Sequence, residues 1–436
     1  MIWNKTAECA ERKELEKVQL AKLKRTVERV YKNVETYRDK MQQKGIAPGD
    51  ITSLEDLKKL PFTTKDDLRK NYPYGMFASP LSEIVRIHAS SGTTGKPTVV
   101  GYTRRDLENW AECIARCFAM AGGDKTSVIQ VAYGYGLFTG GLGAHGGAEY
   151  MGASVIPMSS GNTQKQILLM KDFKSTILCC TPSYALTISE ALKKAGTTTD
   201  ELVLESGIFG AEPWTEGMKK EIEKGLGIKA YDIYGLSEVM GPGVACSCSE
   251  NKGMHIMEDM FIAEIIDPKT EEVLPYGEKG EIVFTTIGKE GIPLIRYRTR
   301  DICSLMPEKC GCGRTTLRMT RVMGRSDDML IIRGVNVFPS QIETVISTFE
   351  ELTLNYKIIV GRKDNKDTFE LHVELAEGLA IDDIRSVEEL RKRVDHDLRA
   401  VLGIGCTLRF LNEGTLPRSE GKAVRVEDTR NLSERV

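Results

Sequence analysis

The sequence predicts an α/β fold with a large N-terminal domain, in which helices flank parallel sheets, a small β subdomain, and a small α+β C-terminal domain. Between residues 84 and 234, short apolar runs alternate with helical patterns, which is typical of a parallel sheet covered by helices. From residue 260 the pattern changes to strand, polar turn and strand, as in an antiparallel meander or a small barrel. We therefore expect an N-terminal domain over residues 1–326, with its β subdomain at about 245–326, and a C-terminal domain over residues 327–436.

The expected elements follow the hydrophobic periodicity along the chain. An amphipathic helix is predicted around residues 20–34, where apolar side chains recur every three or four positions. The stretches SLED at Ser53 and TKDD at Thr64 match the capping box that begins many helices. Strands are predicted at SVIQVA, ASVIPM, TILCC, SGIFG and KAYDIY, with helices at TQKQILLMKDF and TEGMKKEIEKGLG between them. The C-terminal domain is predicted from MLIIRGVNVFPSQIETVIS, the hairpin-like pair YKIIVGRKDNKDTFELHVEL and the helix SVEELRKRVDHDLRAVLG.

Composition narrows the classes of protein that fit. The 436 residues carry 60 basic and 62 acidic side chains, a formal net charge of -2, which disfavours a nucleic-acid binder. The sequence has no signal-like N-terminus and no long apolar run, so we expect a cytoplasmic protein without a membrane segment. Its eleven cysteines are an odd number and are scattered, which favours reduced thiols over a disulfide framework.

The stretch SSGTTGKPTVV at residues 90–100 combines hydroxyls, glycines and a lysine after an apolar strand pattern. It does not match the Walker A motif, which requires four residues between its glycines and a hydroxyl after the lysine. The backbone N–H groups and hydroxyls of such a loop can wrap a polyphosphate, although the same residues also form ordinary turns. The candidate phosphate ligands are Ser90, Ser91, Gly92, Thr93, Thr94, Gly95 and Lys96.

Five further stretches follow this loop in order: GAEPW at 210–214, DIYGLSE at 232–238, YRTRD at 297–301, GRSDDMLIIRGVNVFPSQIE at 324–343 and PRSEGK at 417–422. Together with the loop, this array resembles the acyl-adenylate-forming superfamily of acyl-CoA synthetases, peptide-synthetase adenylation domains and firefly luciferase. The loop, the YRTRD stretch and the 324–343 stretch most resemble the phenylacetate-CoA ligase family. The resemblance covers the chain from about residue 60 to its end.

The resemblance implies that an aryl carboxylic acid reacts with ATP to give acyl-AMP and pyrophosphate, after which the thiol of coenzyme A displaces AMP. It implies ATP, Mg²⁺ and coenzyme A as cofactors and a homodimer as the assembly. An enzyme that loads the acyl group onto the pantetheine of a carrier protein is the alternative, although no carrier domain is recognisable here. A nucleotide-binding regulatory protein without catalysis and a zinc-ribbon nucleic-acid module are further alternatives, and the charge balance disfavours the latter.

Adenylation brings a carboxylate to the α-phosphorus and so forces anions together, which requires a cation and a metal ion at the site. The resemblance implies that Lys422 bridges the carboxylate and the α-phosphate, and that Glu238 supplies an oxygen to Mg²⁺. Asp301 could accept hydrogen bonds from the ribose hydroxyls, with Arg325 as an added donor. Without the resemblance, Lys422 and Glu238 would be interpreted as solvated charges, and Asp301 with Arg325 as a plain ion pair.

The motifs GAEP and DIYG each follow an apolar strand, and open parallel sheets bind ligands at the carboxyl ends of their strands. This placement suits stacking of Tyr234 on adenine and a hydrogen bond from Ser237 to the AMP phosphate. A buried core tyrosine is the alternative interpretation of Tyr234. The residues assigned to the nucleotide from these motifs are Gly210, Ala211, Glu212, Pro213, Asp232, Tyr234, Gly235, Leu236 and Ser237.

The C-terminal domain is implied by the resemblance to be a mobile lid that rotates between the two half-reactions. Asp327 falls at the expected hinge. Gly334 has no side chain and would leave room for a narrow pantetheine channel, although a simple turn glycine fits the sequence equally well.

The acyl pocket is predicted in AYGYGLFTGGLGAHGG, residues 132–147. There Tyr133, Tyr135 and Phe138 are interleaved with glycines, and aromatic walls with free space beside them suit a flat aryl acid. An aromatic cluster of the core is the alternative.

Four residues have the softness and number that one tetrahedral structural Zn²⁺ requires: Cys248, His255, Cys310 and Cys312, with Cys246 as a spare thiol. The spacing is not that of standard zinc knuckles, so free thiols remain equally consistent with the sequence.

Overall fold

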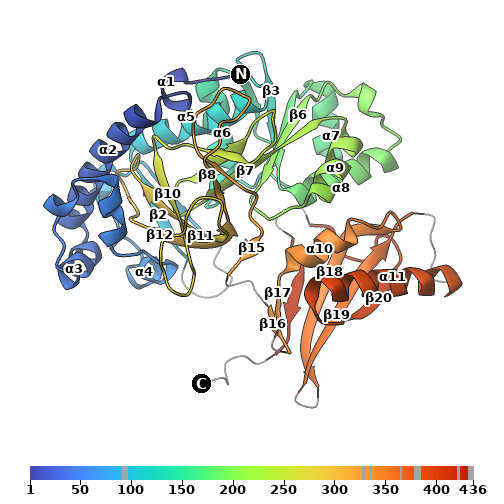
Figure 1. Ribbon diagram of the computed structural model, residues 1–436. Helices are drawn as coiled ribbons and strands as arrows, with labels where there is room; N and C mark the ends of the chain where they lie inside the picture. The colour runs from blue at the N-terminus through green and yellow to red at the C-terminus, as the bar shows by residue number, and fades with distance from the viewer. Residues whose placement is uncertain are drawn as a thin grey trace.

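The computed structural model describes residues 1–90, 97–326, 330–333, 335–363, 366–377, 384–419 and 423–430. A large N-terminal domain and a small C-terminal domain are evident in Figure 1, as the sequence predicts. The N-terminal helices are α1 (Lys5–Glu8), α2 (Arg12–Asn33), α3 (Glu35–Gln43) and α4 (Lys65–Lys70). The helix predicted around residues 20–34 is α2, and it buries Leu23, Val27 and Val30. No helix of the described residues is long and apolar enough to cross a membrane.

Both capping boxes are present, but they begin different kinds of helix. Thr64 caps α4, with its side chain accepting from the backbone N–H of Asp67. Ser53 precedes a 3₁₀-helix, Leu54–Lys59, instead of an α-helix. The Asp56 carboxylate accepts from the backbone N–H groups of Thr52 and Ser53, so the box pattern fixes the start of the turn and not its type.

A nine-stranded sheet in the order β13-β14-β9-β8-β7-β6-β5-β3-β4 forms the centre of the N-terminal domain. Its parallel strands are β3 (Val128–Val131), β4 (Ser154–Ile156), β5 (Ile177–Cys180), β6 (Ser206–Gly210) and β7 (Lys229–Leu236). The helices are α5 (Arg104–Met120), α6 (Thr139–Met151), α7 (Thr163–Asp172), α8 (Pro182–Lys194) and α9 (Glu216–Leu226). Helices α5 and α6 bury their apolar side chains in one cluster, and α7 to α9 contribute to a second, so each face of the sheet is covered.

The β subdomain predicted from about residue 245 is organised differently from the expectation. Strands β8 (Gly241–Ser247), β9 (Met254–Ile256), β13 (Leu305–Met306) and β14 (Arg318–Met319) extend the large sheet beyond β7. The reason is that β8 turns back as an antiparallel partner on the free edge of β7. A separate antiparallel sheet is formed by β10 (Phe261–Ile266), β11 (Gly280–Thr286), β12 (Tyr297–Cys303) and β15 (Gly324–Arg325). The predicted hairpin of β10 with β11 is confirmed.

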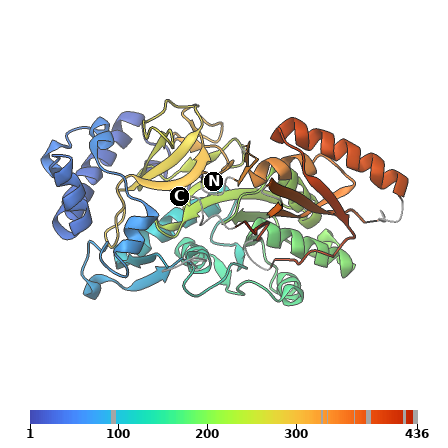
Figure 2. The ribbon, with the colours of Figure 1, turned by 90° about the horizontal axis from the view of Figure 1, so that it is seen from below.

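The C-terminal domain contains two small sheets and two described helices. Its elements are β16 (Leu330–Ile332), β17 (Val335–Val337), α10 (Pro339–Ile346), β18 (Leu352–Lys363), β19 (Lys366–Leu375), α11 (Ile384–Leu402), β20 (Thr407–Leu411) and β21 (Val426–Asp428). The four-stranded sheet has the order β20-β19-β18-β21. The domain lies next to α8 and α9 of the large domain in both views (Figures 1 and 2). One apolar cluster includes residues of α8, α9, α10 and β18, so the two domains share a contact.

Candidate active site

Strands β7, β12 and β15 bring three of the predicted nucleotide residues into direct contact. The hydroxyl of Tyr234 donates to Oδ2 of Asp301 over 2.6 Å, and Nη1 of Arg325 lies 3.2 Å from Oδ1 of the same carboxylate. Asp301 pairs with Arg325 in the register of β12 with β15. Burial and the neighbouring Asp301 carboxylate raise the pKa of Tyr234 well above its usual value, so the phenol stays a donor. The Asp301 carboxylate is therefore held in a fixed orientation.

Glu238 follows β7 and is buried, with two partners that come from distant parts of the chain. Its Oε1 accepts from the hydroxyl of Thr98 at 3.3 Å and lies 3.4 Å from Nζ of Lys65. Thr98 also contacts Ser90 through their hydroxyls at 2.6 Å. Ser90 and Thr98 flank the predicted phosphate loop, so Glu238 lies beside the described residues at both ends of that loop. Sequence reasoning missed Lys65, because TKDD was interpreted only as a helix start.

The turn between β7 and β8 is held by side chains from three other segments. Ser237 shares a hydrogen bond of 2.9 Å with the hydroxyl of Thr139 at the start of α6. The hydroxyl of Tyr102 donates to the carbonyl of Met240 at 2.9 Å. Lys289 is buried, lies 4.5 Å from the centre of the Tyr102 ring, and donates to the carbonyl of Val239 at 3.2 Å. Burial lowers the pKa of Lys289 to about 8. No sequence motif had indicated Lys289.

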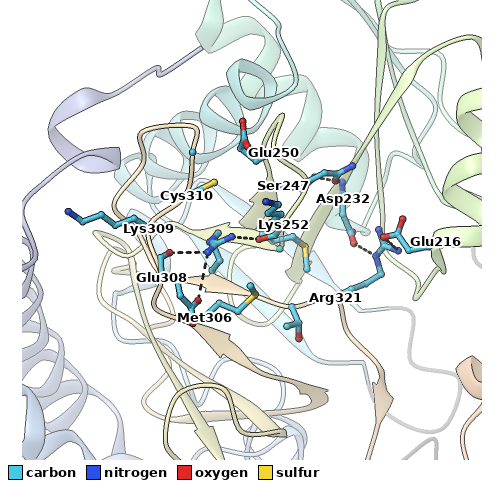
Figure 3. Close-up of a pocket in the computed structure, with 16 residues that line it drawn as sticks. Glu216, Asp232, Ser247, Glu250, Lys252, Met306, Glu308, Lys309, Cys310 and Arg321 are labelled. Carbon is cyan, nitrogen blue, oxygen red and sulfur yellow. Dashed lines mark hydrogen bonds and ion pairs between the residues drawn. The ribbon is translucent and has the colours of Figure 1, made fainter.

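Asp232 points into a cavity of about 690 Å³ (Figure 3). Its Oδ2 accepts from Nε of Arg321 at 3.1 Å, and Arg321 also pairs with Glu216 at 3.0 Å. Burial raises the pKa of Asp232. The cavity continues to two further loops, one with Glu250 and one with Cys310, so it joins a predicted nucleotide residue to the cysteine-containing loops.

The GAEP motif begins at Gly210, the last residue of β6, and the packing there leaves no room for a side chain. A Cβ on Gly210 would lie 2.2 Å from the carbonyl oxygen of Ile233, and Ala211 has a φ of +73°. Gly235 is equally confined, because its Cβ would lie 2.0 Å from the carbonyl oxygen of Gly241. These glycines allow neighbouring strands to approach, which is a packing role. Pro213 follows in the exposed turn, and Leu236 ends β7 half-buried.

Glu212 of this motif lies between the two domains. Its Oε1 accepts from the backbone N–H of Ser183 at 2.7 Å, and its Oε2 accepts from the backbone N–H of Ala423 at 2.9 Å. Ser183 lies in the first turn of α8, and Ala423 belongs to the C-terminal domain. Glu212, which the sequence assigned to the nucleotide, therefore contacts backbone N–H groups of both domains.

The three aromatic residues predicted for the acyl pocket occupy different environments. Tyr133 is buried and lines a small apolar cavity of about 10 Å³ with Ala144, Ile208 and Ile233 among its neighbours. The hydroxyl of Tyr135 lies 3.2 Å from Nδ1 of His145. Phe138 is 37% exposed at the start of α6. A Cβ on Gly140 would lie 2.5 Å from the Phe138 ring, and one on Gly141 would lie 3.0 Å from the Tyr135 ring, so these glycines provide space for both rings.

The predicted metal ligands Cys248, His255, Cys310 and Cys312 converge, with ligand atoms within 4.8 Å of one another. The Sγ atoms of Cys248 and Cys310 are 3.6 Å apart, and Sγ of Cys312 lies 3.4 Å from Nε2 of His255. Nδ1 of His255 lies 3.0 Å from the hydroxyl of Thr316. Burial lowers the pKa of His255 to about 3, so the imidazole is neutral. Cys246 lies outside this cluster and is buried in the core.

Several predicted residues lie outside the described part of the chain, and they are Ser91, Gly92, Thr93, Thr94, Gly95, Lys96, Asp327, Gly334 and Lys422. Their neighbours Ser90, Thr98 and Ala423 lie within it.

Comparison with known proteins identifies relatives over almost the whole chain. The AMP-binding enzyme family matches residues 10–288, and the AMP-binding enzyme C-terminal domain matches residues 334–430. Phenylacetate-coenzyme A ligase of Escherichia coli (strain K12) is 52% identical over 96% of both chains. The phenylacetate-coenzyme A ligase of Thermus thermophilus is 46% identical over 99% of this chain and 100% of that protein.

Solved structures of a 2-hydroxyisobutyryl-CoA ligase, 28% identical, indicate which domain arrangement this chain adopts. In the postadenylation state with an acyl-AMP bound, that ligase gives a TM-score of 0.92 over 98% of this chain and 92% of that chain. In the thioesterification state with coenzyme A, the TM-score is 0.73 over 99% and 93%. The two domains of this chain therefore lie as in the postadenylation state. On its sequence and its fold, the chain belongs to the phenylacetate-coenzyme A ligase family of AMP-binding enzymes.

Proposed function

We propose that this chain converts phenylacetate or a related aryl acid to its CoA thioester through an acyl-AMP intermediate, releasing AMP and pyrophosphate. The observation that carries the proposal is the convergence of motif residues from separate strands. The buried Tyr234 and Asp301 and the half-buried Arg325 form one group, and Glu238 lies beside the flanks of the predicted phosphate loop. The identity of 46–52% to phenylacetate-coenzyme A ligases supports this substrate class.

In this mechanism the Asp301 carboxylate accepts hydrogen bonds from the ribose hydroxyls, because Tyr234 and Arg325 already fix both of its oxygens. Tyr234 presents its ring to adenine, and Ser237 donates to the α-phosphate. The phosphates lie along Ser90–Lys96. Lys422 balances the charge that develops when the carboxylate oxygen attacks the α-phosphorus and pyrophosphate leaves.

Glu238 fits a magnesium ion, because its buried carboxylate already attracts the Lys65 ammonium at 3.4 Å. Carboxylate oxygen is a preferred ligand of Mg²⁺, which neutralises phosphate charge when bound. Lys65 is 41% exposed at its side chain, so it can move away from Glu238 towards the phosphates.

The acyl group is assigned to the space beside Tyr133, Tyr135 and Phe138 at the start of α6. The cavity next to Tyr133 has room for about one water-sized group, so an aromatic ring requires movement of a neighbouring side chain. Phe138 is the most exposed of the three aromatic side chains. After adenylation the C-terminal domain would turn at Asp327, with Gly334 beside the pantetheine channel.

The test is AMP release from ATP and Mg²⁺ with a panel of carboxylic acids, each with and without coenzyme A. Phenylacetate-dependent AMP release that becomes catalytic only with coenzyme A is the expected result. If no acid releases AMP, the ligase assignment is wrong. If turnover requires a pantetheinylated carrier protein, loading of a carrier replaces CoA ligation as the function.

We also propose one structural Zn²⁺ at Cys248, His255, Cys310 and Cys312. Three thiol ligands and one neutral imidazole are a usual structural donor set, and Thr316 holds the other imidazole nitrogen. Elemental analysis should find about one zinc per chain. Cys312→Ser should lose the metal, whereas Cys246→Ala should keep it. A zinc content far below one in metal-replete protein would contradict the site.

The remaining expectations, a homodimer and a cytoplasmic location, rest on the family and on the sequence. Light scattering coupled to size-exclusion chromatography tests the dimer, and fractionation of the producing cells tests the location. A monomeric mass at micromolar concentration would remove the dimer from the proposal.

A further inference from the structure

We propose that Glu212 is a positioning residue that docks the chain beside Lys422 on the large domain during adenylation. The inference rests on the proposed function, because it assigns Lys422 to the first half-reaction. It replaces the assignment of Glu212 to the nucleotide. Lys422 lies outside the described residues, and the argument uses only its covalent neighbour Ala423.

Glu212 bridges two domains through both of its carboxylate oxygens. One oxygen accepts from the N–H of Ser183, 2.7 Å away, and the other accepts from the N–H of Ala423, 2.9 Å away. Ser183 is the second residue of α8, where a carboxylate also favours the positive end of the helix. Because α8 anchors Glu212 firmly, the carboxylate fixes Ala423 in turn. Ala423 is bonded directly to Lys422, so this contact limits where the lysine can reach.

A second contact holds the same segment on its other side. Arg418 lies four residues before Lys422 and pairs with Glu190 of α8 at 3.0 Å. Arg418 also pairs with the fully buried Glu374 of β19 at 2.8 Å, which fixes the arginine within its own domain. The amide of Asn355 donates to Glu190 at 3.3 Å. The described residues on either side of Lys422 are therefore held by the large domain, Arg418 by Glu190 of α8 and Ala423 by Glu212 of the GAEPW motif.

These contacts connect two domains that, as the resemblance implies, turn relative to each other between the two half-reactions. The domain arrangement of this chain is close to that of the 2-hydroxyisobutyryl-CoA ligase in its postadenylation state, with a TM-score of 0.92. Against the thioesterification state of that ligase the TM-score is 0.73. Contacts through Glu212 and Glu190 therefore favour the adenylating arrangement. Their loss should slow adenylation and spare the transfer of a preformed acyl-AMP to coenzyme A.

The decisive variant is Glu212→Gln, which has nearly the same shape. An amide has a single carbonyl oxygen, so it cannot accept from Ser183 and Ala423 in the same way. Adenylation is measured as pyrophosphate release with phenylacetate and without coenzyme A. Thioester formation is measured separately with synthetic phenylacetyl-AMP and coenzyme A. We expect adenylation to fall at least tenfold at saturating ATP, with the KM for ATP and the second half-reaction changed less than twofold.

Glu190→Gln should give the same pattern with a smaller loss, about threefold. Lys193→Ala is the matched control, because Lys193 on α8 forms an ion pair with Glu377 of the C-terminal domain that is exposed on both sides. Its two half-reactions should stay within twofold of the unaltered chain. If Glu212→Gln raises the KM for ATP or slows both half-reactions equally, Glu212 binds the nucleotide and the proposal is wrong.

Hydrogen exchange tests the docking without any substrate. Glu212→Gln should speed exchange in the peptide that contains Ala423, whereas Lys193→Ala should not. Unchanged exchange in Glu212→Gln overturns the proposal. If the unaltered chain adenylates no acid, the proposed function is wrong, and exchange alone then decides whether Glu212 docks this segment.

Discussion

The nucleotide side of the large domain and its contact with the C-terminal domain are built from different kinds of interaction. On the nucleotide side, Tyr234, Asp301 and Ser237 are buried, and each is held by a partner on another element. Across the domain contact, the polar partners are half-exposed or exposed, as in the pairs Arg418 with Glu190 and Lys193 with Glu377. Buried groups make a preformed site, whereas exposed pairs contribute little and exchange readily. The difference is consistent with the proposal of a preformed nucleotide site beside a C-terminal domain that turns between the half-reactions.

The largest effect is expected from the charge that the C-terminal domain brings to the rigid site. Lys422→Ala should reduce adenylation more than about 100-fold, which corresponds to roughly 3 kcal/mol of lost transition-state stabilisation. ATP binding, measured by calorimetry, should persist because most of the residues proposed to contact the nucleotide lie in the large domain. Turnover close to that of the unaltered chain would overturn the role of Lys422.

Asp301→Asn tests the rigidity of the nucleotide side. The substitution removes the ion pair with Arg325 and weakens acceptance from ribose hydroxyls, so the affinity for ATP should fall by about 1–3 kcal/mol, roughly 5- to 150-fold. Tyr234→Phe keeps the ring and removes only the hydroxyl, and should cost less. Equal affinity in Asp301→Asn and the unaltered chain would mean that Asp301 is a structural ion pair.

Metal removal tests a third region, the cluster of Cys248, His255, Cys310 and Cys312, where we propose a structural zinc. Chelation of zinc should lower the melting temperature by several degrees, because each lost kcal/mol shifts a large domain by about 2–4 °C. The KM for ATP should change little in the fraction that remains folded. Calorimetry before and after zinc is restored measures the effect, and an unchanged melting temperature would contradict a structural metal.

The smallest effect is expected from salt. Raising the ionic strength from 0.1 M to about 0.5 M screens exposed pairs much more than buried ones. Adenylation should therefore decline about twofold relative to thioester formation from supplied acyl-AMP. A larger decline in thioester formation would reverse the comparison between the two regions.

Much of the fold was predictable because it depends on local periodicity. From residue 128 to residue 234, the predicted alternation of strands and helices corresponds to the parallel strands observed. Before it, β1 (Arg86–Ala89) and β2 (Val99–Tyr102) pair antiparallel in a sheet of their own. The motifs indicated Asp301, Arg325 and Tyr234, which do lie together. Periodicity could not show that β8 would turn back onto β7, because strand pairing depends on which sheet edge is free.

The contacts that the sequence missed join residues far apart in the chain. Lys65 and Glu238 are 173 positions apart, and the local pattern of Lys65 indicates only a helix start. Lys289 lies in a loop without a recognisable motif, and only its burial against the Tyr102 ring shows that it supports the turn after β7. Glu212 sits inside a recognisable motif, yet its partners are backbone amides, which have no sequence signature. Contacts of this kind can be found only in the three-dimensional structure.

The glycines of α6 have a practical consequence for altering the range of acids that the protein accepts. Gly140 and Gly141 leave the volume into which the rings of Phe138 and Tyr135 fit. A methyl group added at Gly140 would meet the Phe138 ring first, at 2.5 Å, whereas one added at Gly141 would meet the carbonyl oxygen of Gly134 at 2.7 Å before the Tyr135 ring at 3.0 Å. If the acyl group binds beside these rings, as we propose, a library aimed at smaller or larger acids should vary Gly140 first, because a side chain there acts directly on a ring.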